Sequence, residues 1–355
     1  MIFKIADRLV GKNQPIFFIA EAGVNHNGSL EKAKKLVNTA KECGADAIKF
    51  QSFITDEIIL PNAPKSTYHI ETTGKDTKQS WTELLKTQEM SKKMHENLID
   101  YCKSKKIIFL STPYEEKSAD LLDSFNMPAF KIASTDNNNI KLLKHVAVKG
   151  KPIILSTAMS SEEEVIKSMD FLFKVGATEI VLMQCTGSYP SDLKDSNLNV
   201  IKKYKEIFKD KCLFGYSDHT ESFINPVAAS AIGISMYEKH FTLDKKLEGP
   251  DHRMSLNPEE LQKTIKLIRQ TETSLGVFKK QVLSCEVENR NKLKKSLVAK
   301  ENISKGTKLT YDLITSKRPG NGISPSDIDK IVGQVSSVDI KKNTLLKKDM
   351  FNNHE

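Results

Sequence analysis

The chain has 355 residues, of which 39% are hydrophobic and 28% are charged, and its formal net charge is +9. This length predicts one large domain followed by a smaller one, and the composition excludes an intrinsically disordered protein. A basic charge can indicate nucleic-acid binding. Here the Lys residues are spread along the chain and interleaved with Asp and Glu, so we expect no nucleic-acid partner.

No apolar run approaches the roughly 18 residues that a transmembrane helix requires, and the first residues lack the layout of a signal peptide. We therefore expect no membrane association and a cytoplasmic location. The five cysteines are widely spaced and form no CxxC pair, which favours reduced thiols over a disulfide or zinc framework.

Eight short apolar runs alternate with amphipathic stretches between residues 15 and 275. The runs cover residues 16–23, 46–52, 107–113, 129–134, 151–158, 179–186, 212–219 and 235–242. In the first intervening stretch, apolar residues recur at helical spacing, with Ser29 as the expected N-cap and Gly44 as the expected stop. Residues 162–175 and 258–275 follow the same pattern. Eight strand–helix units predict an α/β protein with a (β/α)8 TIM barrel, and the alternative is an open doubly wound sheet.

Each apolar run becomes polar at its C-terminal end. In a TIM barrel these ends converge on the face where loops build the active site, so we expect one shared site there. The polar residues at the ends include Glu21, Lys49, Gln51, Thr112, Lys131, Ser134, Ser156, Gln184, Ser217, Asp218, His219, Glu238, Lys239 and His240.

His219 and His240 end the seventh and eighth runs, which are neighbours in a closed barrel. Two imidazoles there can share a divalent metal ion, with Asp218 and Glu238 available to orient them. Ligand type alone favours zinc, iron or nickel over manganese.

Three lysines, Lys49, Lys131 and Lys239, end strands together with several hydroxyl side chains. Such a set can replace the hydration of a phosphorylated or carboxylated substrate, so we interpret it as an anion site. A Lys that forms a Schiff base is the second interpretation.

A long stretch, residues 53–88, follows the second run and predicts a rim loop that is either a lid or a mere excursion. After residue 275 the alternation stops. We expect a barrel domain over residues 1–275, a linker over 276–296 and a small β-rich domain over 297–355. The last contains two similar segments, "ISKGTKLTYDLI" (303–314) and "IKKNTLLKKDMF" (340–351), which predict pseudo-twofold pairing.

The motifs together resemble the bacterial sialic acid synthase family, whose members make nine-carbon 2-keto sugar acids. They are, in chain order, "AEAGVNHNGSLEKAKKL", "GADAIKFQSF", "FLSTP", "FKIAS", "GYSDHT", "EKHFTLDKKLEGPDHRMSL" and "KRPGNGIS". The resemblance implies a TIM barrel with a C-terminal antifreeze-like (SAF, β-clip) domain. It also implies a cytoplasmic homodimer in which that domain is swapped over the partner's active site.

The resemblance implies a reaction in which phosphoenolpyruvate condenses with an N-acylated mannosamine-type sugar and water, giving sialic or legionaminic acid and phosphate. His219 and His240 would bind the metal, which is manganese, magnesium or cobalt in such enzymes. Glu21, Lys49 and both histidines would be catalytic. The residues expected to bind the substrates are Gln51, Thr112, Lys131, Ser134, Asp136, Ser156, Tyr189, Ser217, Asp251 and, from the other subunit, Arg318.

Three positions depart from the pattern of the resembling family. Thr135–Asp136 stands where Gly-Glu is common, and Ala158 stands where Gly is common. Gly187 stands two residues before Tyr189, where synthases of N-acetylneuraminate have Asn. The acceptor is therefore expected to be N-acetylmannosamine or a di-N-acetylated 6-deoxy sugar. A pseudaminic acid synthase, another metal-dependent barrel that condenses phosphoenolpyruvate, or a non-enzymatic binding protein are the alternatives.

Overall fold

The computed structural model describes residues 1–61, 63–65, 67–73 and 80–352. The chain divides into two compact units, Met1–Gly276 and Val277–Glu355, and each is described by itself below. Within the described ranges, no helix is both long enough and apolar enough to cross a membrane.

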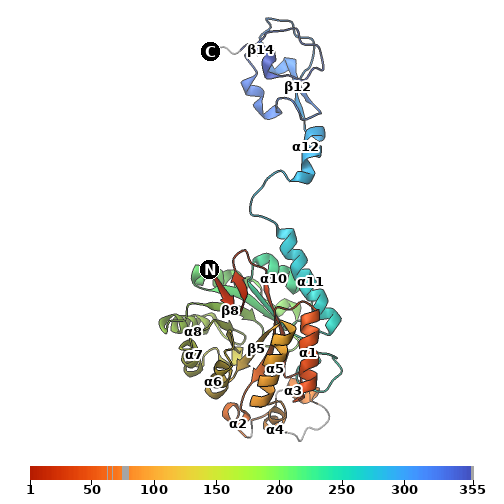
Figure 1. Ribbon diagram of the computed structural model, residues 1–355. Helices are drawn as coiled ribbons and strands as arrows, with labels where there is room; N and C mark the ends of the chain where they lie inside the picture. The colour runs from red at the N-terminus through yellow and green to blue at the C-terminus, as the bar shows by residue number, and fades with distance from the viewer. Residues whose placement is uncertain (62, 66, 74–79, 353–355) are drawn as a thin grey trace. The chain divides into compact units, whose positions relative to one another are not determined.

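The first unit is built on an eight-stranded parallel sheet, and each of the eight predicted runs contains one of its strands (Figure 1). The strands are β3 (Phe17–Gly23), β4 (Ala47–Ser52), β5 (Ile108–Pro113), β6 (Phe130–Ile132), β7 (Ile153–Ser156), β8 (Ile180–Cys185), β9 (Leu213–Asp218) and β10 (Met236–His240). Nearly every residue in them is buried, as expected for parallel strands covered on both faces.

The order of the strands identifies the sheet as a barrel. Hydrogen bonds connect them in the order β5-β4-β3-β10-β9-β8-β7-β6, so the first and last strands of the barrel, β3 and β10, are neighbours. The two ends of this series, β5 and β6, are in contact with each other along the remaining seam. The predicted (β/α)8 architecture is thereby confirmed, and the open sheet is wrong.

A helix follows each barrel strand in the described structure. These helices are α1 (Leu30–Glu42), α5 (Lys92–Lys105), α6 (Glu116–Ser124), α7 (Ile140–Ala147), α8 (Glu162–Lys174), α9 (Asn199–Phe208), α10 (Ile224–Ile232) and α11 (Pro258–Leu275). The predicted start of α1 is confirmed, because the Ser29 side chain accepts a hydrogen bond from the Lys32 amide. At α11, Asn257 and Glu260 form a capping box around Pro258.

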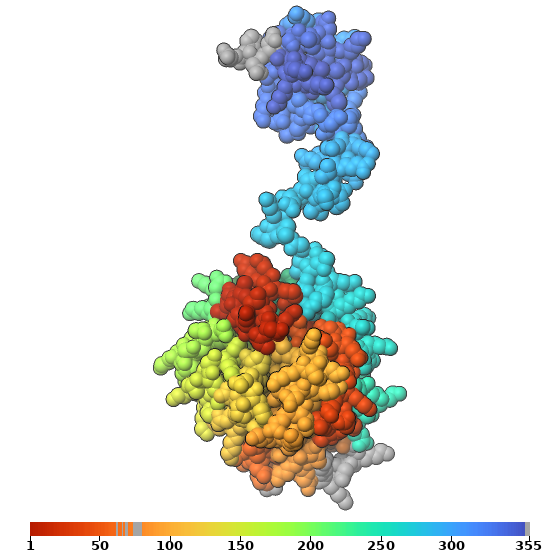
Figure 2. Space-filling view, in the orientation of Figure 1, coloured from red at the N-terminus to blue at the C-terminus, as the bar shows by residue number. Residues whose placement is uncertain are grey.

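Two further features close the ends of the barrel. A hairpin of β1 (Ile2–Ile5) and β2 (Arg8–Gly11), which the sequence analysis did not predict, adds Phe3, Ile5 and Val10 to the barrel core. At the opposite end, the stretch after β4 contains α2 (Thr55–Ile58), α3 (Thr67–Thr72) and α4 (Trp81–Lys86). Figures 1 and 2 show the red hairpin at one end of this unit, and Figure 1 shows the helices α2 and α4 at the other.

The second unit begins with η4 (Ser284–Glu286) and α12 (Val287–Leu293), and continues as a small β-rich domain. Its strands are β11 (Ser296–Ala299) with β12 (Ile314–Lys317), and β13 (Val335–Ser336) with β14 (Phe351–Asn352). The two similar segments pair as predicted, since the amides of Ile303 and Ile340 donate to each other's carbonyls at 2.8 Å. The turn glycine Gly306 in one segment corresponds to Asn343 in the other, and both have positive φ.

The pseudo-twofold matches extend to the short helices of this domain. Each segment runs through a single 3-10 turn into a strand, η5 (Tyr311–Leu313) into β12 and η7 (Lys348–Met350) into β14. The longer η6 (Pro325–Lys330) lies between the two halves. A separate apolar cluster, which includes Leu297, Ile303 and Ile340, forms the core of this unit.

Candidate active site

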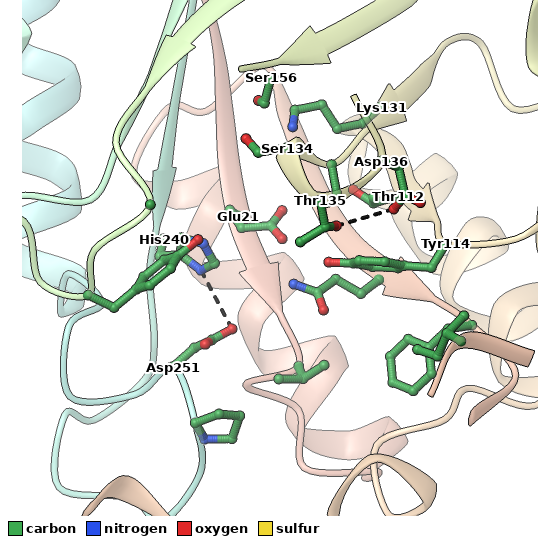
Figure 3. Close-up of a pocket in the computed structure, with 18 of the residues that line it drawn as sticks. Glu21, Thr112, Tyr114, Lys131, Ser134, Thr135, Asp136, Ser156, His240 and Asp251 are labelled. Carbon is green, nitrogen blue, oxygen red and sulfur yellow. Dashed lines mark hydrogen bonds and ion pairs between the residues drawn. The ribbon is translucent and has the colours of Figure 1, made fainter. Parts of the chain in front are cut away.

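A cavity of about 1010 Å³ lies at the C-terminal ends of the barrel strands. It brings together the predicted site residues that lie in the barrel. They are Glu21, Lys49, Gln51, Thr112, Lys131, Ser134, Asp136, Ser156, Tyr189, Ser217, His219, His240 and Asp251. In the view of Figure 3, Glu21 lies between His240 with Asp251 on one side and Lys131, Ser134 and Ser156 on the other.

The alternation of β9 and β10 decides which charged residues reach this cavity. Ser217 and His219 line it from β9, and Glu238 and His240 line it from β10, whereas the residues between them point outward. Lys239 is therefore not one of the cavity cations, and that expectation is wrong. Successive side chains of a strand point to opposite faces, so Lys239 cannot face the cavity when His240 does.

Lys239 instead forms a buried ion pair with Asp218 behind the cavity. Its Nζ lies 2.9 Å from Asp218 Oδ2, which also accepts a hydrogen bond from Tyr237 at 2.6 Å. The other oxygen of Asp218 accepts from the amide and hydroxyl of Thr220, both at 2.9 Å. Asp218 was expected to orient the histidines directly. In the structure it binds Lys239, Tyr237 and Thr220 instead, and so connects the two strands that lead to the histidines.

The rings of His219 and His240 are neighbours in the lining of the cavity, and their centroids lie 5.4 Å apart. His219 Nδ1 lies 2.7 Å from the carbonyl of Thr186, and because a carbonyl only accepts, this nitrogen carries the proton. In the neutral ring Nε2 is then left with a free lone pair. The Tyr189 ring covers both, at 4.3 Å from the His219 ring and 6.3 Å from the His240 ring.

His240 is the less satisfied of the pair. Its Nδ1 is buried and has no hydrogen-bond partner among the described residues, and Asp251 Oδ2 lies 3.8 Å away. Burial, together with the charges of His219 and Lys49, keeps the pKa of His240 well below its usual value, so the ring is neutral and can offer a lone pair.

These features fit a divalent metal ion that takes two protein ligands. In the described part of the chain, no group of three or more His, Cys, Asp or Glu side chains is arranged to hold a metal by itself. An ion at His219 and His240 would therefore complete its coordination with water and substrate oxygens.

The two lysines that do line the cavity are compensated by carboxylates. Lys49 Nζ lies 2.7 Å from Glu21 Oε2 and donates to Thr112 Oγ1 at 2.8 Å. Lys131 Nζ lies 3.6 Å from Glu238 Oε1, which also accepts from Ser217 at 2.9 Å. Burial lowers the pKa of Lys131 despite Glu238. For Lys49, burial opposes the charged form, but Glu21 and Glu238 raise its pKa above the usual value.

Two acids in the cavity, Glu21 and Asp251, have pKa values suited to proton transfer. Burial outweighs the neighbouring Lys49 and raises the pKa of Glu21 to about 7. Burial also raises the pKa of Asp251 to about 6, against the opposing charges of His219 and Lys49. A carboxyl group with a pKa near neutrality can act both as an acid and as a base in one cycle.

Gly23 permits three of these side chains to converge. Its φ is +51°, and a Cβ placed on it would lie 3.1 Å from Asp251 Oδ2, 3.3 Å from Gln51 Nε2 and 3.4 Å from Glu21 Oε1. Only glycine adopts such a backbone without cost and leaves this space to the neighbouring polar groups.

The insertion after β4 forms part of the cavity wall. Ile58 and Ile59 from the end of α2, and Trp81, Leu84 and Leu85 from α4, line the cavity together with the polar strand ends. Most of this wall is apolar, with Glu57, Thr67 and Gln88 as its polar members, in contrast to the charged strand ends. The described residues of this stretch thus contribute to the site, and its role as a lid stays a prediction, since residues 62, 66 and 74–79 lie outside the described residues.

Several cavity residues were not predicted from the sequence, among them Glu238, Tyr114 and Cys185. Glu238 was considered only as a partner of the histidines, although counting back two residues from His240 would have placed it on the same face. Tyr114 and Cys185 lie next to strand ends that had already supplied a polar residue, and no spacing marked them. Cys185 Sγ lies 3.6 Å from His219 Nδ1.

His252 and Arg318, which lie in two of the quoted motifs, do not line the cavity. His252 is buried with hydrogen bonds to Thr242 at 2.6 Å and Asn27 at 3.2 Å, which accounts for it structurally. Arg318 belongs to the second unit, where its Nε donates to the Leu293 carbonyl at 3.0 Å, and its role remains a prediction.

Comparison with known proteins places this cavity in a family. The sequence profile of the NeuB family matches residues 36–280, more than half of the chain, and that of the SAF domain matches residues 294–352. The chain belongs to the NeuB family. Its barrel and its C-terminal SAF domain are thus both those that the resemblance implied.

Several proteins similar to this chain are named synthases. An N,N'-diacetyllegionaminic acid synthase from Campylobacter jejuni is 40% identical over 93% of this chain and 98% of its own length. The human N-acetylneuraminate-9-phosphate synthase is 36% identical over 98% of this chain and 96% of its own length. The crystal structure of an N-acetylneuraminic acid synthetase from Leptospira borgpetersenii, in complex with citrate, matches with a TM-score of 0.70. It is 31% identical and covers 82% of this chain and 97% of the other. The chain is accordingly an enzyme, and a non-enzymatic binding protein is ruled out.

Proposed function

We propose that the enzyme condenses phosphoenolpyruvate with an N-acylated mannosamine-type sugar and water, releasing phosphate and a nine-carbon 2-keto sugar acid. The observation that carries this proposal is one cavity in which two buried lysines and several hydroxyl groups lie together with a pair of buried histidines. The first group suits a phosphate and a carboxylate, and the second suits an aldehyde oxygen through a metal ion.

Lys49, Lys131 and the hydroxyl groups of Thr112, Ser134, Ser156 and Ser217 would hold phosphoenolpyruvate. One of these groups is available for a ligand as it stands, because Ser156 Oγ is buried without a hydrogen-bond partner among the described residues. A bound anion would give Ser156 an acceptor and draw the lysines away from their carboxylates.

The sugar would lie on the side of His240, held by Gln51, Tyr189, Asp251 and Glu21, next to Asp136. A divalent ion on His219 and His240, which we propose to be manganese with magnesium or cobalt as substitutes, would supply a Lewis acid to the aldehyde. Asp136 is already ordered by Asn139 and Thr135, at 3.0 Å and 3.2 Å, on the rim of the cavity (Figure 3).

The bonding changes balance without a further reactant. The enol π electrons of phosphoenolpyruvate form the new bond from C3 to the aldehyde carbon, and the aldehyde oxygen takes up a proton. The oxygen of water adds at C2, and the C2–O bond to the phosphate then breaks, leaving the 2-keto acid. Glu21 is placed to deliver or accept these protons, because its pKa is raised to about 7 by burial. The lysines stabilise the negative charge as it moves to the phosphate.

Among the acceptors, a di-N-acetylated 6-deoxy mannose is favoured, giving a legionaminic acid. The insertion lines the cavity with several apolar side chains, beside Glu57, Thr67 and Gln88, and position 187 is a glycine without an amide that could bind a hydroxyl group. N-Acetylmannosamine and the altrose sugar of a pseudaminic acid synthase are the alternatives.

The test is phosphate release from phosphoenolpyruvate with manganese in the presence of each sugar. The sugars are N-acetylmannosamine, 2,4-diacetamido-2,4,6-trideoxymannose and its altrose counterpart, each with and without a chelator. We expect chelator-sensitive release with the diacetamido mannose sugar and a nine-carbon keto acid by mass spectrometry. No release with any sugar would refute the proposed reaction.

A further inference from the structure

One cavity residue has no part in the proposed reaction and an unusual conformation. Met159 follows β7, lines the cavity and keeps 71% of its surface exposed. Its φ is +61°, which is uncommon for a residue other than glycine, Asn or Asp. A strained, exposed apolar side chain at a cavity wall needs a compensating reason.

The loop that carries Met159 is fixed on both sides. Thr157 Oγ1 donates to the Met183 carbonyl at 2.8 Å, and the Tyr204 hydroxyl donates to Thr157 Oγ1 at 3.1 Å. The Ala158 amide donates to Ser134 Oγ at 2.9 Å, which ties the loop to the neighbouring strand end. Met159 is therefore presented to the cavity by a rigid turn.

Its side chain occupies space that Gly187 leaves open. A Cβ at position 187 would lie 2.9 Å from Met159 Cγ, 3.3 Å from its Sδ and 3.4 Å from Ala158 Cβ. Any larger residue at 187 would have to displace Met159. The two positions are complementary, and the surface they form consists of a thioether, a methyl group and a glycine backbone, with no hydrogen-bonding side chain.

We propose that Met159 and Gly187 form a specificity-determining wall, which receives a methyl group of the acceptor sugar and discriminates against a hydroxymethyl group at the same place. This inference rests on the proposed function and names the substrate group that the wall recognises, a methyl group of the acceptor sugar. A hydroxyl group pressed against this wall loses its water without gaining a partner. Such a wall discriminates by about 10- to 100-fold in kcat/KM.

Two pairs of acceptor sugars isolate the methyl group. N-Acetylmannosamine and its 6-deoxy form differ only at C6, and N-acetyl- and N-glycolylmannosamine differ only on the acyl group. We expect the enzyme to prefer the methyl member of one pair by at least about 10-fold in kcat/KM. The pair that shows the preference identifies which methyl group faces the wall.

The variants test whether Met159 causes the preference. Met159→Gln has nearly the same length and needs the same backbone, and it should bring the ratio of the two kcat/KM values close to one. Met159→Leu is the matched apolar control and should keep the ratio. Gly187→Ala should also lower the ratio, since its Cβ displaces Met159. Because Met159 is exposed, all three should fold, which thermal unfolding checks.

Each outcome decides between the two proposals. If both pairs are turned over with a kcat/KM ratio near one, the proposed role of the wall is wrong but the reaction stands. The same holds if Met159→Gln lowers kcat/KM equally for both members of a pair. Absence of phosphate release with every sugar would overturn the reaction and the wall with it.

Discussion

At the residue scale, the buried imidazole of His26 links stability to pH. His26 is fully buried after β3; its Nδ1 accepts a hydrogen bond from the Gly28 amide at 3.0 Å. Burial, with a smaller effect of His95, lowers its pKa from 6.5 to about 4. The folded pKa lies below the unfolded one, so the stabilisation is complete above pH 6.5 and is lost as the pH falls toward 4.

His26→Asn should weaken this dependence, since the Asn oxygen can accept from Gly28 but does not titrate. Between pH 7 and pH 5 we expect the wild type to lose about 2 kcal/mol more unfolding free energy than the variant. Urea unfolding at both pH values measures the difference. Parallel pH profiles of the two proteins would contradict the assignment.

The residues of the site show what a sequence can and cannot predict. Ten predicted side chains at strand ends meet in one cavity, because strand ends converge in a barrel and their polarity is visible in the sequence. Asp136, Tyr189 and Asp251, which also line the cavity, follow only from the family resemblance. Lys239 was misplaced because three adjacent ionisable residues end β10, and only their alternation, fixed by pairing with β3, says which of them face inward. Met159 could not have been selected, since its role depends on its backbone conformation and on the space above Gly187.

At the scale of elements, the Asp218–Lys239 pair connects β9 to β10 directly behind the two histidines. Both side chains are almost completely buried. Lys239→Met leaves the Asp218 carboxylate without its cation, and Asp218→Asn leaves the ammonium without its anion. Each should cost about 3–5 kcal/mol of unfolding free energy.

The double variant Asp218→Asn/Lys239→Met removes both charges and should cost clearly less than the sum of the two. Urea unfolding of the four proteins gives the coupling free energy. Additive costs would mean that the two groups do not depend on each other.

The insertion contains a natural reporter of binding. Trp81 in α4 is the one tryptophan of the chain, and it lines the cavity. Saturating phosphoenolpyruvate and sugar should therefore change the intrinsic fluorescence in a saturable way, because the ligands alter the surroundings of the indole. Trp81→Phe should abolish the signal. A wild-type signal that does not respond to ligand under conditions of turnover would argue against contact between α4 and the substrates.

The elements that were predicted least well are those with unusual turns. The eight barrel strands and the caps of α1 and α11 follow from apolar runs and capping residues. The β1–β2 hairpin does not, because its turn places Ala6 at φ +54°, a position where glycine or Asn would have signalled the turn.

At the scale of the whole molecule, the family resemblance predicts a site completed by Arg318 from a second subunit. Mixing inactive Arg318→Ala with inactive His240→Ala should restore part of the activity, because a mixed dimer contains one site with both native residues. The mixture is assayed for phosphate release after subunit exchange has been demonstrated. Activity no higher than that of either variant alone would exclude the exchange of Arg318 between subunits.

The pairing of β3 with β10 also has a consequence for synthesis of the chain. These strands are neighbours in space, and their register sets Glu21 beside His240, yet more than two hundred residues separate them along the chain. A ribosome must therefore release nearly the entire barrel before the first strand can pair with the last, and such distant contacts make folding slow. Because the proposed proton carrier and metal ligand meet only where β3 pairs with β10, a nascent chain that lacks this pairing has no functional centre. Catalytic competence and closure of the barrel are then acquired in a single event.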